Sequence, residues 1–135
     1  METLKLTIPG NPITKKNHSR IINVKGRPML IPSAQYKDYE KDFIKECKAQ
    51  KVWALELDKP LTVKCSYYME TRRKVDLSNL LNGTDDALIA AQVIKDDNCC
   101  IIVSHDGSRI YYDKENPRVE IEISDETPTF PDTKK

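Results

Sequence analysis

The segment from Leu61 to Met69 carries an apolar residue at every second position over nine residues. These apolar positions are Leu61, Val63, Cys65, Tyr67 and Met69. A period of two is the pattern of a β-strand that buries one face and exposes the other. A chain that contains such a strand has to build a sheet and cover one side of it with other elements.

Two other segments have the periodicity of helices. The first begins after an expected N-cap at Ser33 and runs to about Lys51, with apolar side chains on one face and lysines on the opposite face. The second, of roughly sixteen residues, begins at Asp76, which is expected to cap it. The stripe of this helix that is expected to face the core consists of Leu77, Leu81, Thr84 and Leu88.

Shorter strands complete the predicted fold. They are expected at residues 4–8, 99–104, 109–112 and 119–123, with a hairpin made by 21–24 and 28–31. The order of elements predicts an α+β fold, in which a single domain has one mixed β-sheet packed with two main helices. We expect residues 1–123 to form this domain, and residues 124–135, which are polar with two prolines, to form a flexible C-terminal tail.

The charge of the chain is divided unevenly. The net charge is only +1 over 135 residues, but residues 1–75 hold 16 Lys/Arg against 8 Asp/Glu, and residues 76–135 hold 6 against 13. A basic half beside an acidic half favours a polyanion-binding surface next to an acidic site. A solvated, lysine-rich helix face with no ligand remains the alternative.

Several classes of protein are disfavoured. No run of about 18 apolar residues predicts a membrane span, and the N-terminus does not have the pattern of a signal peptide, so we expect a cytoplasmic protein. The four cysteines match no zinc-binding spacing, and Cys47 and Cys65 are expected to be buried free thiols.

Two acidic clusters are candidates for a metal site. Asp76 stands at a helix start, and Asp96 and Asp97 stand just before a predicted strand. Mg²⁺ prefers hard oxygen ligands, usually one or two carboxylates with water, and it assists phosphodiester hydrolysis by activating a nucleophile and relieving charge. A helix cap and an acidic turn are the structural alternatives. Asp86 lies about 15 Å along the helix from Asp76, so it is interpreted as a helper or packing partner.

Three segments together resemble one known family. They are Arg73–Leu80, Asp86–Leu88 and Ile94–Asp97, and the N-terminal Ile8–Pro12 with the basic loop after it is also similar. In this order and spacing they resemble the RusA family of Holliday-junction resolvases, over roughly residues 4–123. The resemblance implies a RusA-like fold and a structure-specific endodeoxyribonuclease that makes paired nicks in four-way, branched DNA during recombination and repair. It also implies a homodimer, often encoded in a prophage, that uses Mg²⁺, with Mn²⁺ as a second possibility.

The resemblance assigns roles to particular residues. Catalytic roles fall on Asp76, Asp97, Asn79 and Asn82, and metal binding falls on Asp76, Ser78, Asp96 and Asp97. Contacts to DNA phosphates fall on Lys15, Lys16, Arg20, Arg72, Arg73 and Lys74.

Two positions depart from the family pattern. Ser78 stands where the family has a second helix aspartate, and Asn82 stands where it has a lysine. The first change removes a negative charge from the metal site, and the second removes a cation that would stabilise the transition state. The sequence is therefore compatible with an active junction resolvase, with a catalytically weakened junction-binding protein of the same family, or with a structural phage protein. Asp85 and Asp86 are the residues that could substitute for the lost charge.

Overall fold

The strand β4 (Leu61–Met69) lies at the middle of a mixed sheet in the computed structural model, which describes residues 1–14, 19–32 and 34–130. The other strands of this sheet are β1 (Leu4–Pro9), β5 (Ile102–Ser104), β6 (Arg109–Tyr112) and β7 (Arg118–Asp125). β7 lies antiparallel between β1 and β4. On the other side of β4, β5 pairs in parallel with its first residues and β6 with its last.

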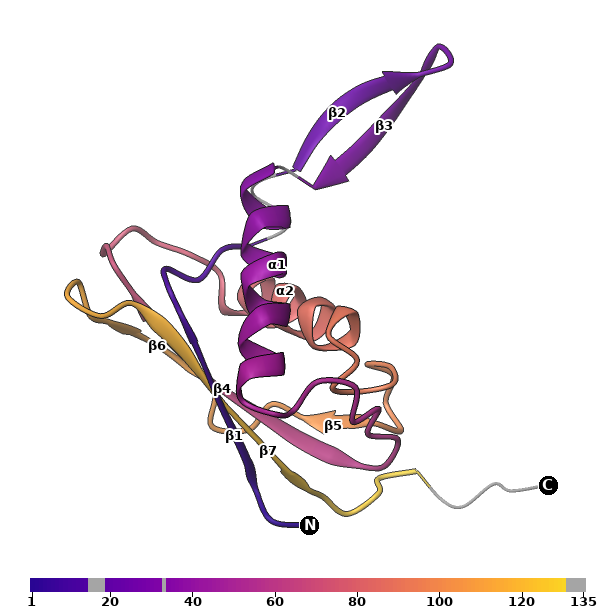
Figure 1. The fold of residues 1–135 in the computed structure, drawn as a ribbon, viewed down its shortest axis with the longest axis vertical. Coiled ribbons are helices and arrows are strands. Elements are labelled where there is room, and N and C mark those ends of the chain that lie inside the picture. Colours follow the sequence, from indigo (N-terminus) through magenta and orange to yellow (C-terminus); the bar gives the residue numbers. More distant parts are fainter. Residues whose placement is uncertain (15–18, 33, 131–135) are drawn as a thin grey trace.

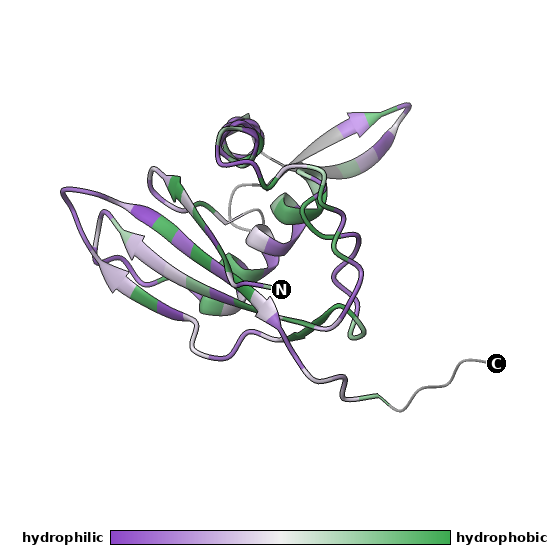
Figure 2. Cartoon of the chain, turned by 60° about the horizontal axis from the view of Figure 1, so that its bottom comes forward, coloured by the Kyte–Doolittle hydropathy of each residue, from purple (hydrophilic) through white to green (hydrophobic). Residues whose placement is uncertain are grey.

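The alternation predicted for β4 is the alternation found. Leu61, Val63, Cys65 and Tyr67 are buried, while the residues between them are partly exposed. Figure 2 shows the same pattern as alternating green and purple bands along the strands of the sheet. One face of the sheet therefore supplies the core and the other faces solvent.

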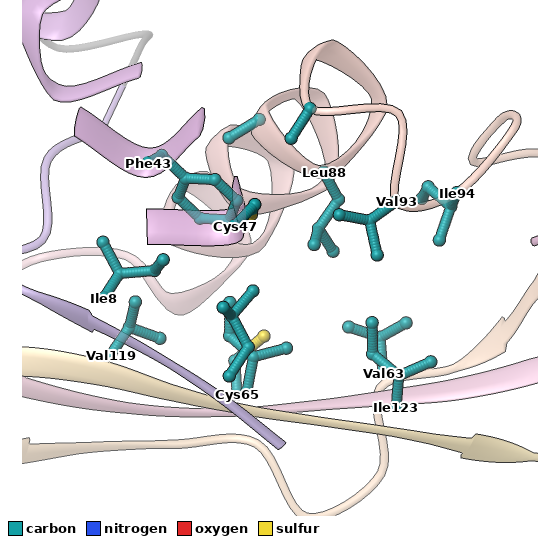
Figure 3. Close-up of a cluster of buried hydrophobic side chains, with 14 of the residues drawn as sticks. Ile8, Phe43, Cys47, Val63, Cys65, Leu88, Val93, Ile94, Val119 and Ile123 are labelled. Carbon is teal, nitrogen blue, oxygen red and sulfur yellow. The ribbon is translucent and has the colours of Figure 1, made fainter. Parts of the chain in front are cut away.

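Two helices, α1 (Ala34–Ala49) and α2 (Leu77–Ala90), lie on the same side of the sheet (Figure 1). In Figure 3, Phe43 and Cys47 of α1 and Leu88 of α2 face Val63 and Cys65 of β4 across the core. The predicted α+β class, with one mixed sheet and two main helices, is confirmed. Within the described ranges, no helix is long and apolar enough to cross a membrane.

The predicted hairpin is also present, with longer strands than expected. β2 (Ser19–Val24) and β3 (Arg27–Pro32) form a separate two-stranded sheet. The backbone φ angles of Lys25 and Gly26 are 52° and 76°. Positive φ at both central residues is the requirement of the two-residue type I′ turn, whose twist matches that of the strands.

The buried face of α2 differs from the predicted stripe. Leu80, Thr84, Ala87 and Leu88 are buried, whereas Leu77 and Leu81 are only partly buried. The reason is that α1 also packs on α2, where the hydroxyl of Tyr36 donates a hydrogen bond to the Gly83 carbonyl at 2.9 Å. Small residues on that side of α2 permit the approach, and the buried face is rotated toward α1.

Two predicted boundaries also shift. The strand expected at 99–104 begins only at Ile102, because the Asn98 carbonyl accepts hydrogen bonds from the Ile101 and Ile102 amides and holds the preceding residues in a turn. β7 continues to Asp125, and the Glu126 amide donates to the Pro60 carbonyl, so the predicted tail begins later than residue 124. Residues 131–135 of that tail lie outside the described residues.

Candidate metal and nucleic-acid site

Asp76 stands directly before the first turn of α2, as predicted. Its backbone has the extended conformation of an N-cap, with φ −84° and ψ 126°, but its carboxylate makes no side-chain capping hydrogen bond. The common structural role of an aspartate at this position is to accept a bond from the first turn of the helix. Because the Asp76 carboxylate does not do so and is exposed, it can bind a ligand.

The residues after Asp76 supply neutral oxygen and amide groups. The Nδ2 atom of Asn79 donates to Oδ2 of Asp76 at 3.3 Å, which orients the carboxylate. Ser78 and Asn82 are exposed and lie one turn apart on α2. The Ser78 hydroxyl is a hard oxygen donor beside Asp76, and Asn82 can donate to a phosphate without neutralising it.

A basic loop leads into this end of α2. Arg72, Arg73 and Lys74 are all exposed, and the Arg72 guanidinium lies 4.5 Å from the centroid of the Tyr112 ring, a cation–π contact. Arg73 and Lys74 line a groove of about 560 Å³, together with the N-terminal segment that follows β1. The lining residues also include Asn11, Pro12, Ile13, Thr14, Gln35, Glu70 and Val75.

The groove brings together two segments that are far apart in the sequence. The Glu70 amide donates to Oδ1 of Asn11 at 3.0 Å, which joins the end of β4 to the N-terminal segment. The groove lining offers an anion two cationic residues, Arg73 and Lys74, against one acidic residue, Glu70, and Asp76 directly follows Val75. The arrangement is therefore suited to hold a phosphate beside a carboxylate.

Asp96 and Asp97 lie in a turn and differ in their surroundings. Oδ1 of Asp96 accepts from the Asp97 amide at 2.8 Å and Oδ2 accepts from the Asn98 side chain at 3.0 Å, and these bonds lower the pKa of Asp96. Burial, the charge of Asp85 and the bond with Asp96 raise the pKa of Asp97. Asp96 therefore shapes the turn, and a nearby cation would favour the charged form of Asp97 against the causes that raise its pKa.

Asp85 and His105 form a pair that the sequence did not indicate. Nδ1 of His105 lies 2.7 Å from the Val63 carbonyl oxygen, and Nε2 lies 3.0 Å from Oδ2 of Asp85. A carbonyl oxygen only accepts, so Nδ1 carries a hydrogen, and the contact at Nε2 requires a second proton between the ring and the carboxylate. Burial lowers the pKa of His105, but its bond to Asp85 and the Asp85 charge raise it more, so the pKa is raised overall.

Asp76 directly precedes α2, whereas Asp97 lies in the turn segment after it and close enough to Asp85 of α2 for the Asp85 charge to raise its pKa. Asp76 follows the Met69 end of β4, whereas the Leu61 amide at the other end of β4 donates to the Ile101 carbonyl, close after Asp97. The 14 residues of α2 make this helix about 21 Å long. Across the described ranges, no group of three or more His, Cys, Asp or Glu side chains is placed to hold a metal ion.

Comparison with protein families decides what kind of chain this is. Residues 9–124 match the family described as Endodeoxyribonuclease RusA. The chain belongs to the RusA endodeoxyribonuclease family. No curated protein matched the chain significantly.

The RusA match covers nearly all of the site described above, since it includes the groove, α2 and the turn with Asp97. Three of the residues assigned to DNA in the sequence analysis, Arg72, Arg73 and Lys74, lie in the loop before α2. Lys15 and Lys16 lie outside the described residues, and Arg20 is described only as part of β2.

Sequence reasoning on this RusA-family chain missed the Asp85–His105 pair. Asp85 lies between the core and the surface of α2, and only 7% of it is exposed. The available signal was its position, since Asp85 falls within one turn of Leu81 and Leu88 and therefore next to the apolar stripe. Its partner, 20 residues further on, could be identified only from the fold.

Proposed function

We propose that this chain is a Mg²⁺-dependent nuclease that resolves four-way DNA junctions by paired nicks and acts as a homodimer. The observation that carries the proposal is the Asp76 carboxylate, which makes no capping bond and follows a groove lined by Arg73 and Lys74. Family membership supports the endonuclease activity. Hard oxygen donors at Asp76, Ser78 and Asp97 are the donor set that Mg²⁺ prefers.

We infer further that the ion is held between two copies of the chain. In the chain, Asp76 directly precedes α2 and Asp97 lies in the turn segment that follows it, and two carboxylates that share one ion must approach within a few ångströms of each other. A two-fold symmetric dimer can place Asp97 of the partner subunit beside Asp76. Each dimer would then hold two equivalent sites, which is the number that paired nicks require.

Each group at the site has a defined task in this proposal. When bound, Mg²⁺ supplies an activated water and neutralises charge on the phosphate. Asn79 keeps the Asp76 carboxylate oriented, and Arg73 and Lys74 position the phosphodiester in the groove. Asp96 has a positioning role, because both of its oxygens hold the turn that presents Asp97.

The test is cleavage of a labelled synthetic four-way junction in Mg²⁺. We expect paired nicks from the wild type, and binding without cutting from Asp97→Asn, which keeps the shape of the side chain and removes its charge. Asp42→Asn removes an exposed carboxylate from α1 and serves as the matched control, which should cut normally. A wild type that binds no DNA at low salt would contradict the proposal altogether.

A second function is favoured by two exposed residues. Ser78 and Asn82 carry no charge at positions beside Asp76, so the site holds one carboxylate and one cation fewer than the family pattern. A chain with these changes could bind branched DNA and cut it slowly or not at all. Tight junction binding with no cleavage in either Mg²⁺ or Mn²⁺ would establish this function in place of the first.

A further inference from the structure

The β2–β3 hairpin forms an arm that is separate from the main sheet. It forms its own two-stranded sheet, and Figure 1 shows it projecting beyond the N-terminal end of α1, away from the main sheet. Residues 23–29, which include the turn and the ends of both strands, are all exposed. Among the hairpin residues whose side chains are described, 23–29, none belongs to the buried cluster of the domain, so this part of the arm can serve another purpose.

The charged residues of the arm and of the segments around it are all basic. No Asp or Glu occurs in the 35 residues from Thr3 to Lys37, which contain seven Lys or Arg. At the tip of the arm, Lys25 and Arg27 are both exposed. In a chain with a net charge of only +1, such an acid-free stretch concentrates positive charge in one part of the sequence.

The arm also exposes apolar side chains beside its cations. Val24 lies directly opposite Arg27 in the hairpin register, and Met29 is two residues further along the same face. The exposed fractions of Val24 and Met29 are 39% and 48%. Exposed apolar side chains around a cation form a surface that gains from being covered by a partner that is both anionic and partly apolar.

We propose that the β2–β3 hairpin is a DNA-binding ribbon that enters a groove of one duplex arm of the substrate. Six residues per strand give it a length of about 20 Å, and a two-stranded ribbon fits the major groove. Lys25 and Arg27 contact phosphates, and Val24 and Met29 lie against sugars or base edges. This inference rests on the proposed function and adds a second DNA contact, separate from the groove at Arg73 and Lys74.

The test uses substitutions that keep the hairpin folded. Lys25→Asn removes a charge and places Asn-Gly, the preferred pair for a type I′ turn, at the tip. Combined with Arg27→Gln, it should reduce the slope of log affinity against log salt concentration by about two for a labelled four-way junction. The control, Lys41→Gln with Lys45→Gln, removes two exposed charges from α1 and should leave the slope unchanged.

A second measurement identifies what the arm touches. A photoreactive amino acid in place of Met29 should cross-link to the junction in the wild-type background. An unchanged salt slope in the hairpin variant, while the wild type still binds and cuts, would overturn this inference and leave the proposed function standing. Cross-links to a second copy of the chain instead of DNA would overturn it too, because they would show that the hairpin contacts a partner subunit. Failure of the wild type to bind any DNA would overturn both.

Discussion

Nε2 of His105 lies 3.0 Å from Oδ2 of Asp85, which joins the residue after β5 to the middle of α2. The other ring nitrogen is held by the Val63 carbonyl of β4, so one imidazole links three elements. Oδ1 of Asp85 is buried and has no hydrogen-bond partner among the described residues. The proton shared by the pair is therefore the main compensation for a carboxylate that is almost fully removed from water.

This pair predicts a pH-dependent stability. The pKa of His105 is raised in the folded state, so its contribution is fully present below the unfolded pKa of about 6.5 and is lost as the pH rises through the folded value. His105→Gln should therefore lower the free energy of unfolding by about 2 kcal/mol at pH 6, since it leaves Asp85 buried without its charged partner, and by less at pH 8. Urea unfolding at both pH values measures this.

Lys95→Gln is the matched control for that experiment. It breaks the exposed Lys95–Asp58 ion pair, which should cost less than about 1 kcal/mol. The cost should not change between pH 6 and 8, because neither of these side chain types ordinarily titrates there. An equal loss for His105→Gln at both pH values would show that the ring matters for packing and not for its proton.

The proposed metal site between two copies predicts complementation between two inactive variants. Asp76→Asn and Asp97→Asn should each fail to cut alone. In a mixed dimer, one site would combine both substitutions and the other would contain both native carboxylates. Co-refolded mixtures should therefore nick one strand of the junction, as seen on a denaturing gel. If all ligands came from one chain, no site in the mixture would be complete and no nick would appear.

The missing charge at residue 78 predicts a gain of metal affinity. Ser78→Asp adds a carboxylate two residues from Asp76, and divalent cation affinity rises with the number of charged ligands. The Mg²⁺ concentration for half-maximal cleavage should fall by about ten-fold. Ala49→Glu adds the same charge at the exposed last residue of α1 and provides the control. A similar shift in both variants would indicate a general charge effect.

The rotated face of α2 predicts unequal costs for two adjacent leucines. Leu80 is 1% exposed, whereas Leu81 is only partly buried. Leu80→Ala should lower the free energy of unfolding by about 3 kcal/mol, because it leaves a cavity, and Leu81→Ala should cost about 1 kcal/mol. Denaturant unfolding of both variants checks this. A larger loss for Leu81→Ala would support the stripe expected from the sequence.

Periodicity correctly predicted the elements whose buried face is set by one core alone. The alternation in β4 and the helical steps of α1 needed only the period and the positions of polar residues. α2 was predicted in its position but not in its orientation, because it packs against α1 as well as the sheet. Contact with two neighbours rotates the buried face away from the stripe that the apolar residues alone indicate.

The sequence predicted which residues belong to the candidate site, but it did not predict how they lie relative to one another in space. Asp76 was expected to cap α2, and its position is that of a cap, but only coordinates show that its carboxylate makes no capping bond. Nothing in the spacing of Asp76 and Asp97 tells whether the chain returns to the start of α2 or stays at its end. That is decided by the pairing of Ile102 with Leu61, a contact between residues about 40 positions apart.

The length of α2 has a consequence for the geometry of cutting. In a dimer whose ions lie between copies, each α2 spans from one ion at its first residue toward the other ion beyond its last. The length of the helix, about 21 Å, then contributes to the separation between the two scissile phosphates. Adding or removing one turn would shift that separation by about 5.4 Å. Related chains should therefore vary in length in the hairpin and loops while the residue count of this helix stays constant.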